Sequence, residues 1–368
     1  MERIKFENSR FKEGGIKKLV QLAESMRKDQ ERPVDVSFAD ILASKHDGLT
    51  IDKFYDEIGI DVTFDTIQNI FTTPDESIRW LIPEIFRDAL RLGYRAAPIW
   101  PAVTSREQQV GQLSQHLPYI NMADAIPMKV GEGETIPIGT LSYGQRSFRI
   151  YKFGRGIKIP DEVQRYVSLA VISIFLEDFG VKMGYGVDAL AMNTLINGEQ
   201  ADGSNSSPVV GIKTKDTLTY RDILKLWIRM AKIGRNPSVM LSGEEMALDM
   251  LDLDAFKTRS SGTTQASLNI KTPMPQSSNL YINGNIDDDQ LVIVDPRVAL
   301  LKMNAVPLVV ESERIVSNQT SAFYASFTTG FAKLFDDSCL ILDRGKKLSD
   351  HPIPTWFNVD ADTWLDME

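Results

Sequence analysis

The longest helical pattern in the sequence lies between Asp161 and Asn197. Apolar residues recur there in steps of three or four, the spacing of one face of an α-helix. The residues of this face are Ile172, Leu176, Phe179, Met183, Val187 and Leu190. One helix of about 36 residues would be roughly 54 Å long, at about 1.5 Å per residue. The alternative is a helix that is broken at three glycines, Gly180, Gly184 and Gly186, since each glycine costs up to about 1 kcal/mol of helix stability relative to alanine.

The length and composition of the chain indicate a folded protein with more than one core. A single hydrophobic core stops growing near roughly 250 to 300 residues, and this chain has 368. We therefore expect two or three lobes. The sequence is 43% apolar and 25% charged, without a low-complexity tract, which is typical of an ordered, soluble protein.

The charge of the chain argues against a general nucleic-acid groove. The formal net charge is -9, whereas binding to phosphates needs clustered lysine and arginine side chains. The stretch from Asp350 to Glu368 contributes much of the negative excess, because it holds five acidic residues and no lysine or arginine.

The single cysteine, Cys339, excludes a disulfide framework within the chain. Its apolar neighbours predict a buried strand position, and we expect maturation in a reducing cytoplasm. The sequence shows no apolar signal-peptide region and no stretch of roughly 18 uncharged apolar residues, so we expect no membrane association.

Helix signals mark the parts of the chain on either side of the long helical pattern. Residues 1–72 are rich in charge and predict an extended arm. A helix follows with Thr73 as cap and Gly93 as stop, with Pro83 as a site of kinking. Residues 207–290 alternate strands and helices, which predicts an α/β lobe. Two pairs of residues are expected to cap the starts of its helices, Thr219 with Asp222 and Ser242 with Glu245.

Each candidate motif for catalysis, cofactor binding or metal binding in the sequence has a better structural explanation. The segment "GYGVDA" at Gly184 matches a dinucleotide pattern but continues a helical period, so helix packing explains it better. The glycines from Gly131 to Gly139 lack the ending of a phosphate loop. The three histidines lack ligand spacing, and "IDDDQ" at Asp287–Asp289 is better explained as a solvated turn. The sequence thus predicts no catalytic residue, no cofactor and no metal site.

The glycine-punctuated segment from Val130 to Ile159 predicts an extended β-hairpin. Such a hairpin is too thin to build its own core, so its apolar side chains must be buried elsewhere, and a neighbouring subunit is the natural place. The expected intersubunit contact residues are Ile136, Ile138, Leu141, Tyr143, Arg146, Phe148 and Arg149. The expected hinge points are Gly131, Gly133, Gly154 and Gly156.

The order of these parts resembles the major capsid proteins of tailed bacteriophages, whose fold is named after phage Hong Kong 97. The resemblance covers nearly the whole chain and implies an α+β fold with a peripheral lobe, a long spine helix, an extended loop and an α/β axial lobe. The implied domains are an N-terminal arm (1–72), a first peripheral part (73–129), the extended loop (130–159), the spine helix (160–206), the axial domain (207–290), and return strands with an acidic tail (291–368).

The resemblance also implies a structural function. The chain would assemble into hexamers and pentamers of an icosahedral shell around double-stranded DNA, in the virion capsid, after assembly in the host cytoplasm. Its expected partners are further copies of itself and scaffolding, portal and decoration proteins. Some relatives join a loop lysine covalently to an asparagine, but residues 130–151 hold no lysine, which predicts a non-covalent shell. Two alternatives remain, an encapsulin shell enclosing cargo protein and, with less support, an enzyme using the α/β lobe.

Overall fold

The computed structural model describes residues 66–67, 81–96, 98–111, 114–119, 132, 135, 138, 142–199, 205–254, 256, 270–271 and 278–354. The chain forms two compact units, each assembled from separate segments. The first unit comprises Met1–Pro98, Tyr151–Gly186 and Ala305–Thr329, and the second comprises Ile99–Ile150, Val187–Asn304 and Gly330–Glu368. The mixture of helices and strands confirms the predicted α+β class.

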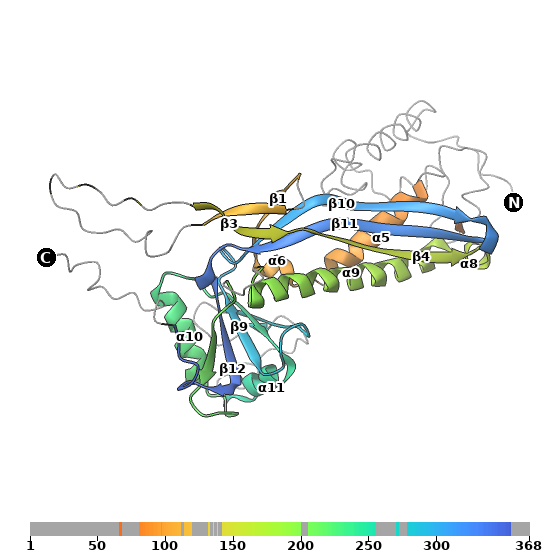
Figure 1. Ribbon diagram of the computed structural model, residues 1–368. Coiled ribbons are helices and arrows are strands. Elements are labelled where there is room, and N and C mark those ends of the chain that lie inside the picture. The colour runs from red at the N-terminus through yellow and green to blue at the C-terminus, as the bar shows by residue number, and fades with distance from the viewer. Residues whose placement is uncertain are drawn as a thin grey trace, which may run out of the picture. The chain divides into compact units, whose positions relative to one another are not determined.

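The first unit is built on long antiparallel strands. Strand β4 (Tyr151–Pro160) pairs with β11 (Thr320–Lys333) along its whole length, and Figure 1 shows the two side by side. Strand β10 (Leu300–Ile315) follows β11 in the order β1-β10-β11-β4. Its first residues belong to the second unit and pair there with β1 (Thr104–Gln109). A short 3-10 helix, η3 (Val316–Asn318), joins β10 to β11. Helix α5 (Leu81–Ala96) packs on these strands through aromatic side chains, because the Phe86 and Phe323 rings lie 4.3 Å apart.

The long helical pattern forms two helices, α8 (Asp161–Tyr166) and α9 (Leu169–Asn197). The break falls at Val167, whose backbone is extended, and at Ser168, which forms a bridge to Thr66. The prediction of one unbroken helix is therefore wrong at its start. The expected alternative, a break at the glycines, is also wrong, since α9 continues through all three of them.

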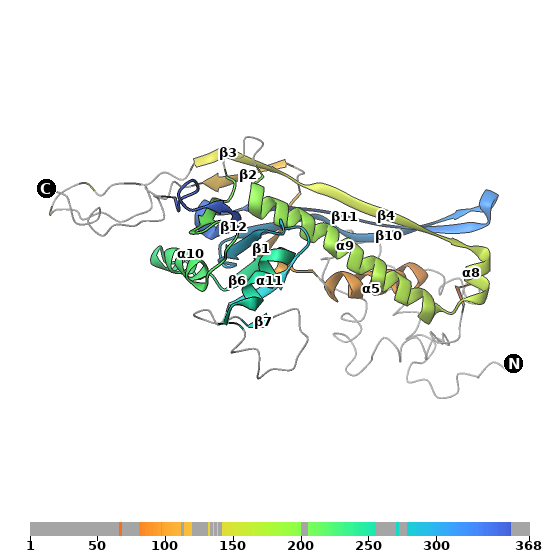
Figure 2. The ribbon, with the colours of Figure 1, turned by 90° about the horizontal axis from the view of Figure 1, so that it is seen from below.

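Close packing between α5 and α9 explains two glycines, Gly180 of α9 and Gly93 of α5 (Figure 2). A Cβ atom on Gly180 would overlap the carbonyl oxygen of Leu90, and one on Gly93 would overlap that of Glu177. Only glycine allows two helix backbones to approach so closely. Gly93 therefore lies inside α5, which ends at Ala96, and the prediction of a stop at Gly93 is wrong.

The second unit contains a six-stranded sheet with the order β5-β12-β9-β6-β8-β7. Its strands are β5 (Val209–Ile212), β6 (Val239–Ser242), β7 (Ile270–Lys271), β8 (Asn279–Ile282), β9 (Gln290–Val294) and β12 (Cys339–Lys347). Helices α10 (Tyr220–Lys232) and α11 (Glu244–Asp252) lie beside β9 and β12 in Figure 1. Both helices contribute to one buried cluster, through Leu226 and Met230 of α10 and Met246 and Met250 of α11.

Of the two capping boxes predicted for this unit, one is confirmed and the other is wrong. Thr219 and Asp222 form the predicted capping box at the start of α10. The second predicted box is wrong, because Gly243 caps α11 and the Ser242 hydroxyl donates instead to the Gly243 carbonyl. Ser242 is the last residue of β6, and a Cβ on Gly243 would overlap the Asp287 carbonyl oxygen. The strand and the turn therefore leave room only for a glycine cap.

The remaining elements of the second unit are short. They are α6 (Trp100–Val103), the 3-10 helix η4 (Asp336–Ser338), β2 (Ser114–Tyr119) and β3 (Ser142–Arg149). Cys339 begins β12 and is completely buried, as the sequence predicts. Among the helices that the structure describes, none has the length and apolar character needed to cross a membrane.

Candidate intersubunit surfaces

The extended hairpin is built from β2 and β3, which pair antiparallel from Ser114 with Arg149 to Tyr119 with Ser142 (Figure 2). The prediction placed both of its strands between residues 130 and 159. The second half of that segment, β4, pairs with β11 in another sheet. Alternation of apolar and polar residues is the same in both strands, so the pattern predicts strands without identifying their partners. The connection between the two hairpin strands is therefore residues 120–141.

The predicted contact residues have different exposures where the structure describes them. Ile138 is 87% exposed and Arg149 is exposed, so both are available to a neighbouring molecule. Phe148 is only 1% exposed, because it packs within its own subunit, and this corrects its prediction as a contact residue. Tyr143 and Arg146 lie on β3, where their backbones pair with Pro118 and Leu117. Ile136, Leu141, Gly131 and Gly133 lie outside the described residues.

The other two predicted hinge points, Gly154 and Gly156, lie inside β4. They pair with Ser326 and Tyr324 of β11. A Cβ atom on Gly156 would come within 2.6 Å of the Tyr324 ring, so this position must be glycine for the ring to lie across the strand. Pairing on β11 therefore corrects the hinge prediction and gives Gly156 a packing role.

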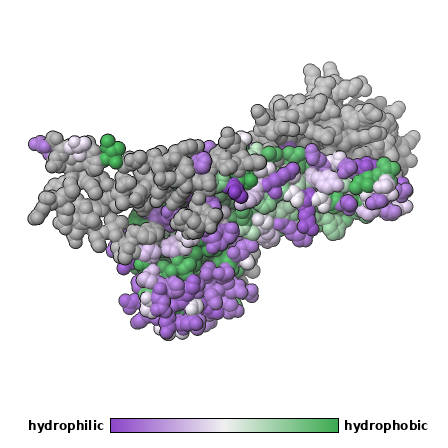
Figure 3. All heavy atoms as spheres, in the orientation of Figure 1, coloured by the Kyte–Doolittle hydropathy of each residue, from purple (hydrophilic) through white to green (hydrophobic). Residues whose placement is uncertain are grey.

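A second apolar surface runs along the exposed face of α8 and α9 and was missed by the sequence reasoning. Tyr166 of α8 is 82% exposed, and on α9 Ile174 is 64% exposed and Phe175 is 70% exposed, with the exposed Val171 on the same face of that helix. We name Tyr166, Val171, Ile174 and Phe175 the α9 patch. Figure 3 shows apolar side chains at the surface among hydrophilic ones. The available signal was the apolar residues that lie off the predicted buried face, because a helix with apolar residues on both faces has two surfaces to cover.

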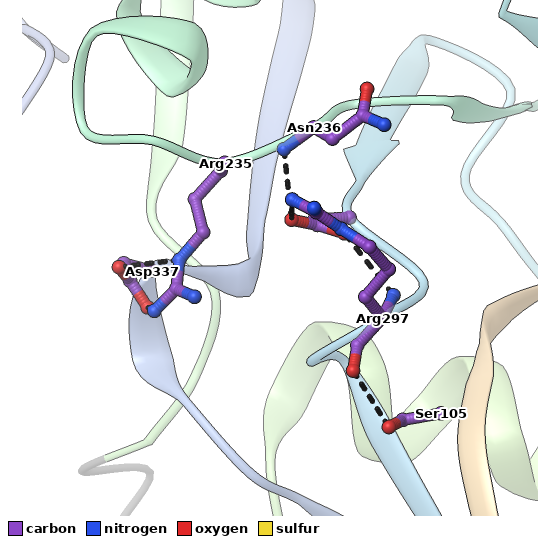
Figure 4. Close-up of polar contacts among 6 residues, drawn as sticks. Ser105, Arg235, Asn236, Arg297 and Asp337 are labelled. Atoms are coloured by element: carbon purple, nitrogen blue, oxygen red, sulfur yellow. Dashed lines mark hydrogen bonds and ion pairs between the residues drawn. The ribbon is translucent and has the colours of Figure 1, made fainter.

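A network of buried carboxylates fixes the loops of the second unit (Figure 4). Asp295 accepts hydrogen bonds from the backbone N–H groups of Asn236 and Arg297 and from the Arg297 guanidinium. Burial acts to raise the pKa of Asp295, but the hydrogen bonds from Arg297 and Asn236 together lower it. Asp337 binds Arg235 through two hydrogen bonds of 2.7 and 2.8 Å, and the Ser105 hydroxyl donates to the Arg297 carbonyl.

A buried carboxylate also caps the short helix α6. Asp188 of α9 is completely buried and accepts hydrogen bonds from the backbone N–H groups of Ile99 and Trp100. Burial raises the pKa of Asp188, and these two backbone donors partly oppose that shift. The Lys302 ammonium lies 3.4 Å from the centre of the Trp100 ring. The three side chains of this cluster, Asp188, Trp100 and Lys302, are buried in the second unit.

The only thiol of the chain lies in a closed polar cluster. The Cys339 thiol lies 2.8 Å from the Ser207 hydroxyl, which accepts a hydrogen bond from the Lys333 ammonium. Burial raises the pKa of Cys339, which favours the protonated thiol. All three side chains are buried within the described part of the chain, with a structural role.

Acidic side chains near the end of β12 bind an arginine. The Arg344 guanidinium lies between Asp249 and Asp289, with Nε and the Asp289 carboxylate 2.6 Å apart. Asp287–Asp289 form the predicted turn before β9. Within the residues that the structure describes, no three histidine, cysteine, aspartate or glutamate side chains are grouped so that they could hold a metal ion.

Comparison with known families identifies the class of protein. A phage capsid protein family matches residues 144–341, more than half of the chain, from strand β3 to strand β12. The chain belongs to this family. It is thus a structural shell protein by its family, which confirms the resemblance found in the sequence. No curated protein sequence matches the chain significantly.

Solved structures of low sequence identity are similar to this chain. The capsid of an empty GTA particle matches with a TM-score of 0.50 and 12% identity, covering 68% of this chain and 90% of that chain. This likeness confirms the predicted capsid fold. A virus-like particle from Pyrococcus furiosus has a TM-score of 0.44 at 10% identity, covering 71% of this chain and 98% of its own. The holo-SrpI encapsulin complex from Synechococcus elongatus PCC 7942 has a TM-score of 0.47 at 13% identity, covering 68% and 88%.

Proposed function

We propose that this chain is the major capsid protein of a tailed bacteriophage. In this proposal it forms hexamers and pentamers of an icosahedral shell that encloses double-stranded DNA. The observation that carries the proposal is the family match over residues 144–341, which includes β3 of the hairpin, β4, α9 and the strands of the six-stranded sheet. The role is structural, and the chain performs no catalysis in it.

Two exposed apolar surfaces support assembly with further copies of the chain. The α9 patch and Ile138 of the hairpin connection present large apolar side chains to solvent. Exposed apolar clusters of this kind mark interaction surfaces in soluble proteins. In a closed symmetric assembly each surface is repeated in every subunit, so weak individual contacts add up to a stable shell.

The proposal includes further partners and a place of assembly. Scaffolding, portal and decoration proteins would bind the shell, which would assemble in the host cytoplasm. The net charge of -9 supports non-specific enclosure of DNA. An acidic surface repels phosphates and would let packaged DNA slide.

The test is expression of the full chain, alone and together with the scaffolding protein of the same phage, followed by negative-stain microscopy. We expect closed shells of uniform size. A variant with Ile174→Ser and Phe175→Ser should remain folded and form few shells. The matched control, Lys182→Ala, removes only an exposed ion pair with Asp178 on the same helix and should assemble normally. A persistent monomer would overturn the proposal, and copurification of a folded cargo protein inside shells would favour an encapsulin.

A further inference from the structure

Strand β4 is an open edge of its sheet. It pairs with β11 on one side, and no described strand pairs with its other side. Seven of its ten residues are exposed, so the free edge is accessible in the subunit. An accessible edge presents unpaired N–H and C=O groups and is a template for adding another strand.

Three cations line this edge without partners in the described structure. Lys152, Arg155 and Lys158 are all exposed, and none makes an ion pair or a side-chain hydrogen bond with the described residues. Lysine on an edge strand discourages uncontrolled pairing between subunits. Such an edge would still accept a strand whose charges are opposite to its own, because electrostatic complementarity selects partners.

The two faces of β4 differ in character. Phe153 stacks on Phe327 with ring centres 5.5 Å apart, and Ile159 on the same face is 6% exposed. Lys152 and Lys158 belong to the opposite face, because successive side chains of a strand alternate. The exposed Arg155 lies on the face of Phe153 and Ile159. A strand that continues this sheet would therefore need one apolar face and one acidic face.

The C-terminal tail has this pattern in its sequence. From Phe357 to Met367, apolar or small residues occupy alternate positions, namely Phe357, Val359, Ala361, Thr363, Leu365 and Met367. Polar and acidic residues occupy most positions between them, namely Asn358, Asp360, Asp362 and Asp366, with Trp364 as the one aromatic exception. This period of two is the signature of a half-buried strand. The tail holds no lysine or arginine after Lys347.

We infer that the C-terminal tail of one copy, residues 355–368, adds to the free edge of β4 in a second copy. Its acidic face meets Lys152 and Lys158, and its apolar face extends the face of Phe153 and Ile159. The alternating stretch of about eleven residues matches the ten residues of β4.

The tail starts from a fixed point in its own subunit. Ile353 packs against the buried cluster of the six-stranded sheet, so the chain is anchored up to that residue. The alternating stretch begins at Phe357, four residues after Ile353, so the added strand would start within about 13 Å of this anchor, at about 3.3 Å per residue. The choice of a second copy rests on the proposed function, in which every subunit has close neighbours.

The first experiment locates the tail in shells assembled from the full chain. Subunits labelled with ¹⁴N and ¹⁵N are mixed, assembled and treated with a carbodiimide, which joins carboxylates to nearby amines. We expect peptides in which Asp360, Asp362 or Asp366 is joined to Lys152 or Lys158, with half of the pairs of mixed isotope. Pairs of a single isotope only would mean that the tail binds its own subunit, and shells without such pairs would overturn the inference. Absence of wild-type shells would instead count against the proposed function.

The second experiment separates strand addition from simple charge attraction. Lys152→Glu with Lys158→Glu should lower the yield of shells about tenfold or more, as should Asp360→Lys with Asp362→Lys, and the four changes together should restore it. The matched control is Lys213→Glu with Lys215→Glu, two exposed lysines of the second unit, which should leave the yield unchanged. A chain whose residues 357–367 are shuffled keeps its charge but loses the alternation. Normal assembly of this shuffled chain would overturn the inference.

Discussion

Asp295 connects two segments of the second unit, because it accepts hydrogen bonds from Asn236 and from Arg297 of its own loop. Its side chain is completely buried, whereas Arg297 is largely exposed. Substitution Asp295→Asn keeps the shape but turns one acceptor into a donor that faces other donors. We expect the free energy of unfolding at pH 7 to fall by about 1–3 kcal/mol. Urea unfolding of the unassembled subunit, followed by tryptophan fluorescence, measures this change.

The lowered pKa of Asp295 determines how the difference in unfolding free energy between wild type and Asp295→Asn depends on pH. A carboxyl group with a lowered pKa in the folded state stabilises the fold above its unfolded pKa, near about 4. That contribution is lost as the pH falls through the folded pKa. The difference between wild type and Asp295→Asn should therefore be largest at pH 7 and shrink below about pH 4. Asp178→Asn, which breaks an exposed ion pair, is the control and should change stability by less than about 1 kcal/mol.

Ile138 and Phe148 lie near each other in sequence, but substitutions at the two positions should have different effects on stability and assembly. Ile138→Ser removes an exposed side chain, so the subunit should keep its stability and lose assembly. Phe148→Ala removes a side chain that is 1% exposed and should destabilise the subunit by about 3–5 kcal/mol. Thermal unfolding and shell yield, measured on both variants, separate the two effects. Equal loss of stability in both variants would contradict the assignment of Ile138 to an intersubunit surface.

These two residues also show how far a sequence can predict a contact surface. Alternation identified both as apolar strand positions, and it cannot distinguish a core within the subunit from a surface between subunits. Phe148 is buried by residues distant in sequence, which no local pattern encodes. The burial of Cys339 was predictable, because its apolar neighbours and its residue type both favour a buried strand.

Glycine in α9 has two different roles that substitution can separate. At Gly180 an added Cβ would overlap the Leu90 carbonyl oxygen of α5, whereas at Gly186 no atom lies within 4 Å of an added Cβ. We expect Gly180→Ala to destabilise the subunit by several kcal/mol, because two helix backbones must move apart. Gly186→Ala should stabilise it by up to about 1 kcal/mol, through helix propensity alone. Chemical unfolding of the two variants gives the comparison, and a neutral Gly180→Ala would contradict close packing of α5 on α9.

The elements themselves were largely predictable, and their boundaries and partners were not. Three of the six residues of the predicted face of α9, Ile172, Leu176 and Val187, are buried, and the other three, Phe179, Met183 and Leu190, are half-buried. The glycine signals misled, since Gly93 was expected to end a helix and Gly180 to break one. Propensity disfavours glycine in an isolated helix, but close packing of a second helix requires it. The same limit applies to β4, where pairing with β11 depends on residues about 170 positions away in sequence.

Both compact units are assembled from three separate segments each, so neither can be cut from the chain as a continuous piece. The six-stranded sheet needs β12 from the C-terminal part of the chain, and the long sheet needs β4 from its middle. The presence of more than one lobe could be expected from the length of the chain alone. Which segments form each lobe depends on strand pairing between residues distant in sequence. Because of this interleaving, each unit can form only when segments from distant parts of the chain come together.

The last prediction is that no covalent bonds join the subunits of the shell, which is tested by boiling shells in denaturant. The hairpin connection is residues 120–141 rather than the segment after Val130, and it therefore includes one lysine, Lys129. Attack on an asparagine amide needs a neutral amine, and only about one lysine in a few thousand is neutral at pH 7 without burial. We therefore still expect a single band near 41.3 kDa when shells are boiled in denaturant. A ladder of multimers that disappears in Lys129→Gln would contradict this prediction and assign the bond to that lysine.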